Sequence, residues 1–218
     1  MDLKKQLDLR GPDNKDIEAK FKKIAELLFQ EYYIKKGDNK YEFLEIEFYY
    51  YTKGHEDIIT YPRQVEAGKW FFHNSGVDIS FESRCKDVKQ PSAIRKPGED
   101  YFGGILIRSL LKKNKDDPKY QLITGPLKCT WDLFDVIDAL KITSEDLPVI
   151  TKKEETSIKK VHSTSRYISI NDEKANQKFD VNFDDFNLFK KENYRYYIKD
   201  ECPKWANLKK SDYNGRPW

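Results

Sequence analysis

The sequence contains few of the residues that build disulfide frameworks, metal sites or membrane segments. Of its 218 residues, only three are cysteines, three are histidines and one is a methionine. Cys85, Cys129 and Cys202 are scattered along the chain, which excludes a disulfide framework and fits no metal-ligand spacing. No stretch is apolar enough to cross a bilayer, and the opening residues lack the apolar centre of a secretory signal. We therefore expect a cytoplasmic protein that makes no contact with a membrane.

The charge and the hydrophobic content fit one globular domain. Forty Lys and Arg residues oppose 37 Asp and Glu, giving a net charge of +3, which is compatible with a basic face but indicates no polyanionic partner by itself. With 38% hydrophobic residues, a chain of this length can bury a sizeable core, so we expect a single domain over residues 1–218. Aromatic residues make up 14% and serve either as a bulky core or as surfaces on which bases stack.

The most informative segment is the aromatic run over residues 41–51, which alternates in the manner of a strand. Alternation turns Leu44, Ile46 and Phe48 to one face. Burial against aromatic rings is unfavourable for a carboxylate unless it has a cationic partner or a chemical role, which makes Glu47 the first candidate for a reacting group. The opposite face of the strand is predicted to hold Phe43, Glu45, Glu47, Tyr49 and Tyr51.

The remaining periodicities predict a mixed α and β fold. An amphipathic helix is expected over residues 16–33 and a second helix, opened by Gly125 and Pro126, up to Leu140. Residues 1–15 are expected to be a flexible segment, and residues 171–185 form a polar insertion to which we assign no role. Further strands are predicted over residues 70–73, 77–81, 103–110, 165–170 and 194–198.

The order of several short motifs resembles that of a known enzyme family. Each motif is weak alone, but the co-linear agreement extends from about residue 20 to residue 205, which chance rarely produces. The motifs are Leu44-Glu45-Ile46-Glu47-Phe48-Tyr49, His55, Pro62-Arg63, Gly68 to His73, Asp78-Ile79-Ser80, Ile105 to Arg108, Gly125 to Lys128, and Tyr194 to Ile198 followed by Pro203 and Trp205. In this order they resemble the alkyladenine (3-methyladenine) DNA glycosylase family.

The resemblance implies a fold, a reaction and a partner. The fold would be a single α+β domain with a curved, largely antiparallel sheet flanked by helices, without a metal or other cofactor. The protein would act as a monomer on DNA, as a duplex carrying a modified base, and would be nucleoid-associated if its host is bacterial. It would flip the base out of the duplex and hydrolyse its N-glycosidic bond with an activated water, leaving an abasic site.

The resemblance also implies roles for nine residues. Glu47 matches the general base, and Arg108 matches the arginine that helps to place that carboxylate and its water. Four further positions fall in the pocket that receives the flipped base, and three fall where the family contacts nucleic acid. The pocket positions are Tyr49, His55, His73 and Asp78, and the nucleic-acid positions are Arg63, Asn74 and Lys128.

The sequence departs from the family at positions that bear on the substrate. Where the family inserts an aromatic wedge into the duplex, this chain has the turn Asn74-Ser75-Gly76. Asp78 stands where the family has an asparagine, and His73 or Phe71 where it has a second pocket tyrosine. An acidic group changes which edge of a base is tolerated, so the identity of the base stays open.

Simpler interpretations exist for each candidate. Glu47 is equally suited to a buried ion pair with Arg108 or Arg63, and Glu45 is a second carboxylate on the same predicted face. A loop histidine such as His55 is commonly solvated, and a histidine at the end of an aromatic strand, such as His73, is commonly a core residue. Asp78 is equally suited to capping a turn, and Lys128 to an exposed surface position.

Three functions therefore remain open at this point. The first is a monofunctional DNA glycosylase, which the pair of Glu47 and Arg108 favours. The second is a non-catalytic nucleic-acid-binding protein on the same scaffold, which the missing aromatic wedge favours. The third is a hydrolase that acts on a nucleoside or nucleotide, because a water activated by a glutamate would serve that reaction too.

Overall fold

Two long antiparallel strands organise the fold, β2 (Asn39–Thr52) and β6 (Phe102–Asn114). They pair along almost their entire length, from Asn39 opposite Asn114 to Tyr51 opposite Phe102. Strand β2 is rich in aromatic residues, which pack well on a pleated surface, and the apolar residues of β6 are mainly leucine and isoleucine. The computed structural model describes residues 2–10, 16–86, 98–114, 120–135, 137, 140–141, 143, 146–166 and 191–198.

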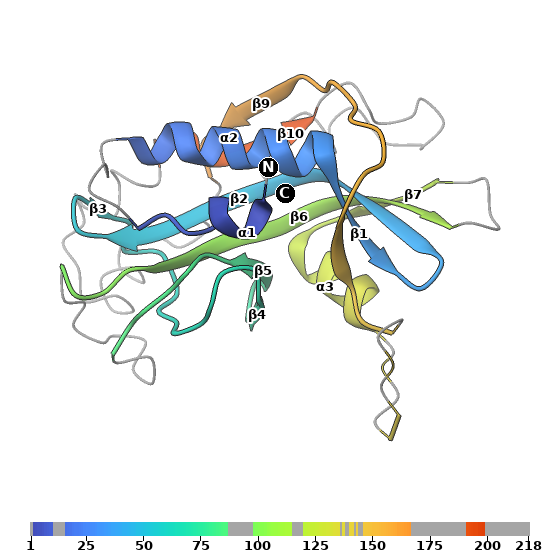
Figure 1. Cartoon of the computed structure of the whole chain (residues 1–218), viewed down its shortest axis with the longest axis horizontal. Coiled ribbons are helices and arrows are strands. Elements are labelled where there is room, and N and C mark those ends of the chain that lie inside the picture. The colour runs from blue at the N-terminus through green and yellow to red at the C-terminus, as the bar shows by residue number, and fades with distance from the viewer. Residues whose placement is uncertain are drawn as a thin grey trace.

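The other strands join these two to form one curled sheet, in which every described pairing is antiparallel (Figure 1). The central order is β4-β5-β6-β2-β1-β8. In addition, β7 pairs with β6, β3 and β10 pair with β2, and β9 pairs with β10. The bounds are β1 (Tyr32–Lys36), β3 (His55–Glu56), β4 (Trp70–His73), β5 (Gly76–Ser80), β7 (Tyr120–Thr124), β8 (Val149–Lys152), β9 (Val161–Thr164) and β10 (Arg195–Ile198).

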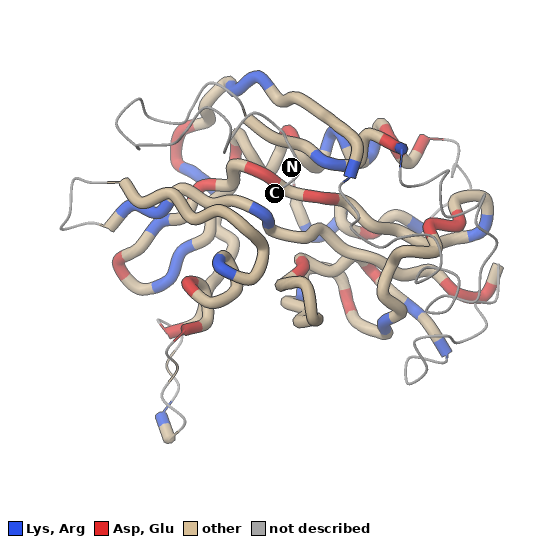
Figure 2. Tube along the Cα trace, turned by 180° about the vertical axis from the view of Figure 1, so that it is seen from behind, with Lys and Arg blue, Asp and Glu red and all other residues tan. Residues whose placement is uncertain are grey.

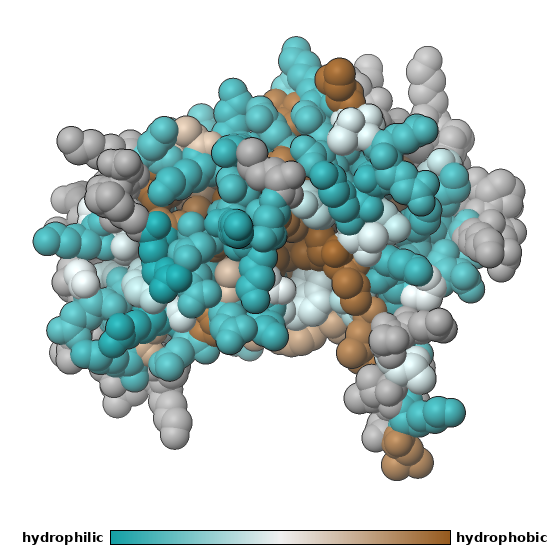
Figure 3. Space-filling view, in the orientation of Figure 1, coloured by the Kyte–Doolittle hydropathy of each residue, from teal (hydrophilic) through white to brown (hydrophobic). Residues whose placement is uncertain are grey.

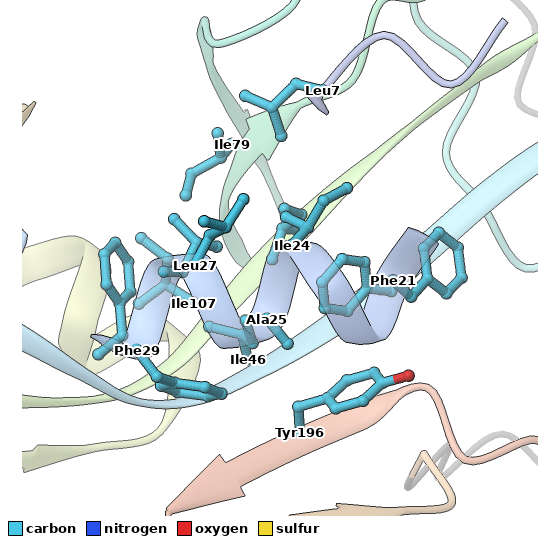
Figure 4. Close-up of a cluster of buried hydrophobic side chains, with 14 of the residues drawn as sticks. Leu7, Phe21, Ile24, Ala25, Leu27, Phe29, Ile46, Ile79, Ile107 and Tyr196 are labelled. Carbon is cyan, nitrogen blue, oxygen red and sulfur yellow. The ribbon is translucent and has the colours of Figure 1, made fainter. Parts of the chain in front are cut away.

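Helix α2 (Ile17–Glu31) lies along one face of the sheet and supplies much of the core (Figures 1 and 4). Its buried residues recur at helical spacing and include Phe21, Ile24 and Leu28. The helix ends at Tyr32, whose extended backbone leads directly into β1. Phe21 packs on Phe48 with a distance of 4.6 Å between the ring centroids, so the helix is fixed to the centre of β2.

Helices α1 (Leu3–Gln6) and α3 (Pro126–Phe134) pack against the same core. Helix α3 begins with a proline at its first turn, where the missing N–H needs no partner, after Gly125 at a φ of 100°. Cys129 and Leu133 of α3 belong to the same cluster of buried side chains as the apolar face of α2. Cys85 and Cys129 are buried and form no disulfide among the described residues, and Cys202 lies outside them.

The structure confirms the α+β class, the single domain and the curled antiparallel sheet expected from the sequence. Helix α2 and strands β2, β4, β5, β6 and β10 lie where the periodicities predict them. The predicted strand over residues 165–170 falls almost wholly outside the described residues, as does the polar insertion over residues 171–185.

Three expectations about the elements differ from the structure. Residues 2–10 are not a flexible segment, because Leu7 and Leu9 are buried in the core, while residues 11–15 lie outside the described residues. Helix α3 ends at Phe134 rather than at Leu140. Strand β9 was not predicted, because the polar segment Val161-His162-Ser163-Thr164 becomes a strand through its pairing with β10 rather than through its own pattern.

The alternation predicted for β2 is wrong at two neighbouring positions, Phe43 and Leu44. The pairing with β6 shifts register between Phe43 and Glu45 and again between Glu45 and Ile46. Phe43 therefore shares the main core with Ile46, whereas Leu44 packs with Leu111 in a separate small cluster. The physical reason is a β-bulge, which changes the face to which neighbouring side chains point and has no signature in a pattern of period two.

The surface carries both signs of charge and few large apolar groups. Figure 2 shows Lys and Arg interspersed with Asp and Glu along the trace, and Figure 3 shows a largely hydrophilic face interrupted by a smaller apolar region. Within the described part of the chain, no helix has both the length and the apolar character needed to cross a membrane.

The core contacts of Phe48 generate a prediction about stability. Phe48 is fully buried against Phe21, Phe81 and Tyr196, so Phe48→Ala should lower the free energy of unfolding by about 3–5 kcal/mol, measured by chemical denaturation. Phe72→Ala is the matched control, because 54% of Phe72 is exposed, and it should cost less than about 1 kcal/mol. Equal losses for the two variants would contradict this description of the core.

Candidate active site

The central residues of the sheet divide between two faces. Directly paired side chains of neighbouring strands lie on the same face, and successive residues of one strand point to opposite faces. Ile46 and Ile107 are paired and face α2 (Figure 4). The adjacent row points to the opposite face, which we call the polar face. This row runs from Asp78 (β5) through Leu106 (β6) and Glu47 (β2) to Arg195 (β10).

Glu47 lies at the centre of the polar face and is held from one side. Its exposed fraction is 0%, and its Oε2 accepts hydrogen bonds from Arg108 Nη1 at 2.9 Å and from the Tyr49 hydroxyl at 2.8 Å. Its Oε1 has no hydrogen-bond partner among the described residues, and Arg195 Nε lies 3.9 Å from it. One oxygen is therefore held by two donors, and the other accepts no hydrogen bond from the described residues.

A second carboxylate, Glu45, balances the charges around this centre. Arg195 forms an ion pair with Glu45 Oε1, the Ser109 hydroxyl donates to Glu45 Oε2 at 3.0 Å, and Arg108 Nε lies 3.5 Å from Glu45 Oε1. Two carboxylates thus face two guanidinium groups, which offsets the unfavourable burial of all four charges. Because both oxygens of Glu45 are engaged, Glu45 is less suited than Glu47 to accept a proton.

The protonation states of the groups around Glu47 follow from burial and from neighbouring charge. Burial, together with the negative charge of Glu47, raises the pKa of Tyr49 well above its usual value, so the phenol keeps its proton and remains a donor. Burial alone would lower the pKa of Arg108, but the charges of Glu47 and Glu45 raise it. Both groups therefore stay able to donate to the Glu47 carboxylate over the physiological range of pH.

A buried ion pair between Asp57 and Arg166 supports Tyr49 from the side. Arg166 donates to both oxygens of Asp57, at 2.6 and 3.2 Å, and to the carbonyl oxygen of Phe48 at 3.1 Å. Its guanidinium carbon lies 4.8 Å from the centroid of the Tyr49 ring. The cation therefore occupies one side of this ring, which the sequence motifs assign to contact with a base.

Three predicted residues form a second charged group on the polar face. Asp78 Oδ2 pairs with Arg63 Nη2 at 2.7 Å, and Asp78 Oδ1 accepts from His73 Nε2 at 3.0 Å. The Ser75 N–H donates to His73 Nδ1 at 3.2 Å, which places the His73 proton on Nε2. Burial opposes ionisation of Asp78, but the charge of Arg63 and the contacts of His73 hold its pKa below the usual value.

Arg63 has a different position from the one its predicted role requires. It was expected to contact nucleic acid, but only 1% of it is exposed. Its guanidinium stacks on the Phe71 ring at 3.9 Å and its Nε donates to the Tyr61 carbonyl oxygen at 3.2 Å. A side chain enclosed in this way does not reach a phosphate backbone, so the structure places Arg63 beside the predicted pocket residues Asp78 and His73.

His55 lies in the core, away from the polar face. Its Nδ1 lies 2.8 Å from the Tyr50 carbonyl oxygen and its Nε2 lies 2.9 Å from the Tyr194 hydroxyl. Its ring stacks on Tyr194 and meets the edge of Phe21 of α2. The predicted contact of His55 with a base is not supported by this environment, because both ring nitrogens are used within the core.

Asn74 and Lys128 are exposed and lie near one end of the sheet. Asn74 occupies the turn between β4 and β5, and Lys128 lies in the first turn of α3. The turn rests on that helix, because a Cβ added to Gly76 would lie 2.9 Å from Pro126 Cβ. Two of the three predicted nucleic-acid contacts are therefore presented to solvent in the same region.

The structure thus brings six of the nine predicted residues to one face, namely Glu47, Arg108, Tyr49, Arg63, His73 and Asp78. It adds Arg195 and Arg166, for which the sequence carries only weak signals. Arg195 alternates with aromatic residues in a strand, a pattern that could have drawn attention to it, but its partner Glu45 is 150 residues away in the chain. No local pattern links Asp57 with Arg166.

Neither a metal site nor a relative supplies further information about this face. Among the described residues, no three His, Cys, Asp or Glu side chains gather in a way that could hold a metal ion. Comparisons with protein-family models, with curated proteins and with solved structures found no match to this chain. The geometry of the polar face and the sequence motifs are therefore the features that bear on function.

The position of His55 generates a prediction about pH dependence. Burial lowers the pKa of His55 in the folded protein, so the unfolded chain binds a proton at a higher pH than the folded one does. Stability should therefore fall as the pH is lowered from about 7.5 to about 5.5, and His55→Gln should flatten this dependence in chemical denaturation at a series of pH values. An unchanged slope in His55→Gln would contradict the assignment.

Proposed function

We propose that the protein is a monofunctional DNA glycosylase-like hydrolase that removes a modified or damaged base, with Glu47 activating the attacking water. The observation that carries this proposal is the asymmetric state of the Glu47 carboxylate, which accepts two hydrogen bonds at Oε2 and has no hydrogen-bond partner at Oε1 among the described residues. A general base needs this arrangement, because it must be held in place and still accept a proton. The order of the sequence motifs suggests the class of substrate.

In the proposed reaction, a water molecule donates a hydrogen bond to Glu47 Oε1, and its oxygen attacks C1′ of the flipped nucleotide. The C1′–O bond forms while the C1′–N bond breaks, and the electron pair of the broken bond leaves with the base. Glu47 takes the proton of the water, and its negative charge faces the positive charge that grows on the sugar. A neutral base leaves as an anion and takes a proton from solvent, and Glu47 releases its proton to solvent. The products are the free base and an abasic site. Because no lysine acts as the nucleophile, we expect no strand cleavage.

Arg108 and Tyr49 act as positioning residues for this step. Arg108 comes from β6 and Tyr49 from β2, so the two donors to Glu47 Oε2 belong to the two longest paired strands of the sheet. A site built on strands holds its groups more precisely than one built on loops. The register of β6 with β2 is irregular at Arg108, and a bulge there changes the direction of the side chain. In this position the guanidinium contacts both Glu45 and Glu47.

A second candidate function is a non-catalytic nucleic-acid-binding protein on the same scaffold. The complete burial of Glu47 favours it, because a closed carboxylate paired with Arg108 also serves a purely structural role. Under this alternative, the exposed Asn74 and Lys128 would contact DNA while the polar face would stabilise the sheet. The two candidates differ in whether base release occurs and depends on Glu47.

Base release from modified duplexes tests the proposal. A panel of duplexes with alkylated, deaminated and bulky modified bases, scored by alkaline cleavage at abasic sites, should show release of at least one base. Glu47→Gln should reduce the rate by about 10²- to 10⁴-fold, which is the contribution of a positioned general base. The control Glu42→Gln changes the same residue type on the same strand, where the side chain is 39% exposed, and should keep the wild-type rate.

Three results would decide against the proposed enzyme. Equal rates for Glu47→Gln and Glu42→Gln would remove Glu47 as the base. Absence of release from every duplex, together with DNA binding that weakens steeply with salt, would favour the non-catalytic protein. Hydrolysis of free nucleosides without salt-dependent binding to DNA would favour the third function suggested by the sequence.

A further inference from the structure

Several buried polar atoms on the polar face have no hydrogen-bond partner among the described residues. Arg108 Nε is one of them, but it lies 3.5 Å from the charged Glu45 Oε1. Three others are Glu47 Oε1, Arg63 Nη1 and Ser80 Oγ. The exposed fractions of these residues are 0%, 1% and 0%, so solvent does not satisfy them in this state. Buried polar groups almost always have partners, and several exceptions on one face call for an explanation. A bound group with complementary atoms would supply the missing hydrogen bonds.

Two of the three atoms come from adjacent rows of the sheet. Ser80, Gly104 and Tyr49 are paired across β5, β6 and β2, and the next row holds Asp78, Leu106 and Glu47. Rows on one face are about 7 Å apart along a strand, and neighbouring strands are about 5 Å apart. Glu47 and Ser80 therefore project from an area comparable in size to one nucleotide, and Arg63 reaches this area from the segment before β4.

Gly104 lets Arg63 lie directly on this area. A Cβ added to Gly104 would lie 2.6 Å from Arg63 Nη1 and 3.1 Å from Asp78 Oδ2, so any side chain here would displace the ion pair. The other atoms of the guanidinium are committed, because Nη2 pairs with Asp78, Nε donates to Tyr61, and the ring of Phe71 lies against its plane. These contacts fix the orientation of Nη1 and leave its hydrogens for an acceptor.

The groups on this part of the face donate rather than accept. Arginine has no acceptor atom, and a serine hydroxyl can donate to the same acceptor. Asp78 does not balance this preference, because its two oxygens already accept from His73 and Arg63. Asp78 is therefore not available to accept a hydrogen bond from a base, although the sequence had suggested this role. The groups beside it that can bind a base are the donors Arg63 and Ser80.

We propose that Arg63 and Ser80 are specificity-determining residues that donate hydrogen bonds to a carbonyl oxygen of the base whose glycosidic bond faces Glu47. The inference rests on the proposed function and extends it by naming the class of base. A carbonyl-bearing base satisfies Arg63 Nη1 and Ser80 Oγ together, whereas an otherwise identical base without the oxygen leaves two buried donors without partners.

A matched pair of substrates tests the proposal. One duplex carries hypoxanthine, and the other carries unsubstituted purine at the same position, so the two differ in the carbonyl group and the ring proton that accompanies it. The wild type should release hypoxanthine faster under single-turnover conditions. Ser80→Ala should lower the ratio of the two rates by about 5- to 10-fold, the effect of one hydrogen bond. Arg63→Lys, which keeps a positive charge beside Asp78, should lower the ratio at least as much.

Stability measurements separate a specific effect from a folding defect. Ser80 Oγ has no partner among the described residues, so Ser80→Ala should leave the melting temperature unchanged or raise it. The control Ser163→Ala changes an exposed serine of β9 and should leave the rate ratio at its wild-type value.

The outcomes distinguish this inference from the proposed function. Release of both bases with a ratio that Ser80→Ala and Arg63→Lys do not change would overturn the inference and leave the hydrolase in place. Release of alkylated bases but of neither test base would overturn it as well. Failure to release any base from any duplex would remove the hydrolase and the inference together.

Discussion

Pairing of buried charges on the polar face is the constraint on which the rest of the structure depends. Glu45 and Glu47 are almost completely buried, and an unpaired carboxylate in this position would be strongly destabilising. Arg108 pairs with Glu47 across 61 residues of sequence, and Arg195 pairs with Glu45 across 150 residues. Arg166 pairs with Asp57 across 109 residues. These ion pairs tie β6, β10 and the segment before residue 167 to the centre of β2, so the geometry of Glu47 depends on distant parts of the chain.

Under the proposed function, one face of the sheet serves stability and the other serves chemistry. On the face of α2, side chains such as Phe48 and Ile46 form an apolar core that fixes the strands. On the polar face, the same strands hold charged groups at defined distances. Because the β2 and β6 backbones are common to both faces, the core fixes the strands that carry the polar groups, and such preorganisation is what electrostatic catalysis requires.

The sequence predicted the elements better than their contacts. Periodicity was sufficient to predict α2, β2 and β6, because each has a periodic pattern that is long enough to distinguish a helix from a strand. It failed at Leu44, where a bulge changes the face, and at β9, which is a strand because β10 pairs with it. The motif order correctly grouped Glu47 with Arg108 and Tyr49, but it placed His55 with them although that ring packs in the core. Ion pairs between residues over 100 positions apart leave no local pattern, so Arg166 and Arg195 were missed.

The central claim is that Glu47 Oε1 holds the attacking water. The most direct measurement is a high-resolution structure of the Glu47→Gln variant bound to a duplex whose modified base the wild type releases. The account predicts an intact, flipped nucleotide on the polar face, with a water between the substituted side chain and C1′ and with Arg108 and Tyr49 still in contact with that side chain. A base bound elsewhere, with the substituted side chain still enclosed and remote from the sugar, would contradict it.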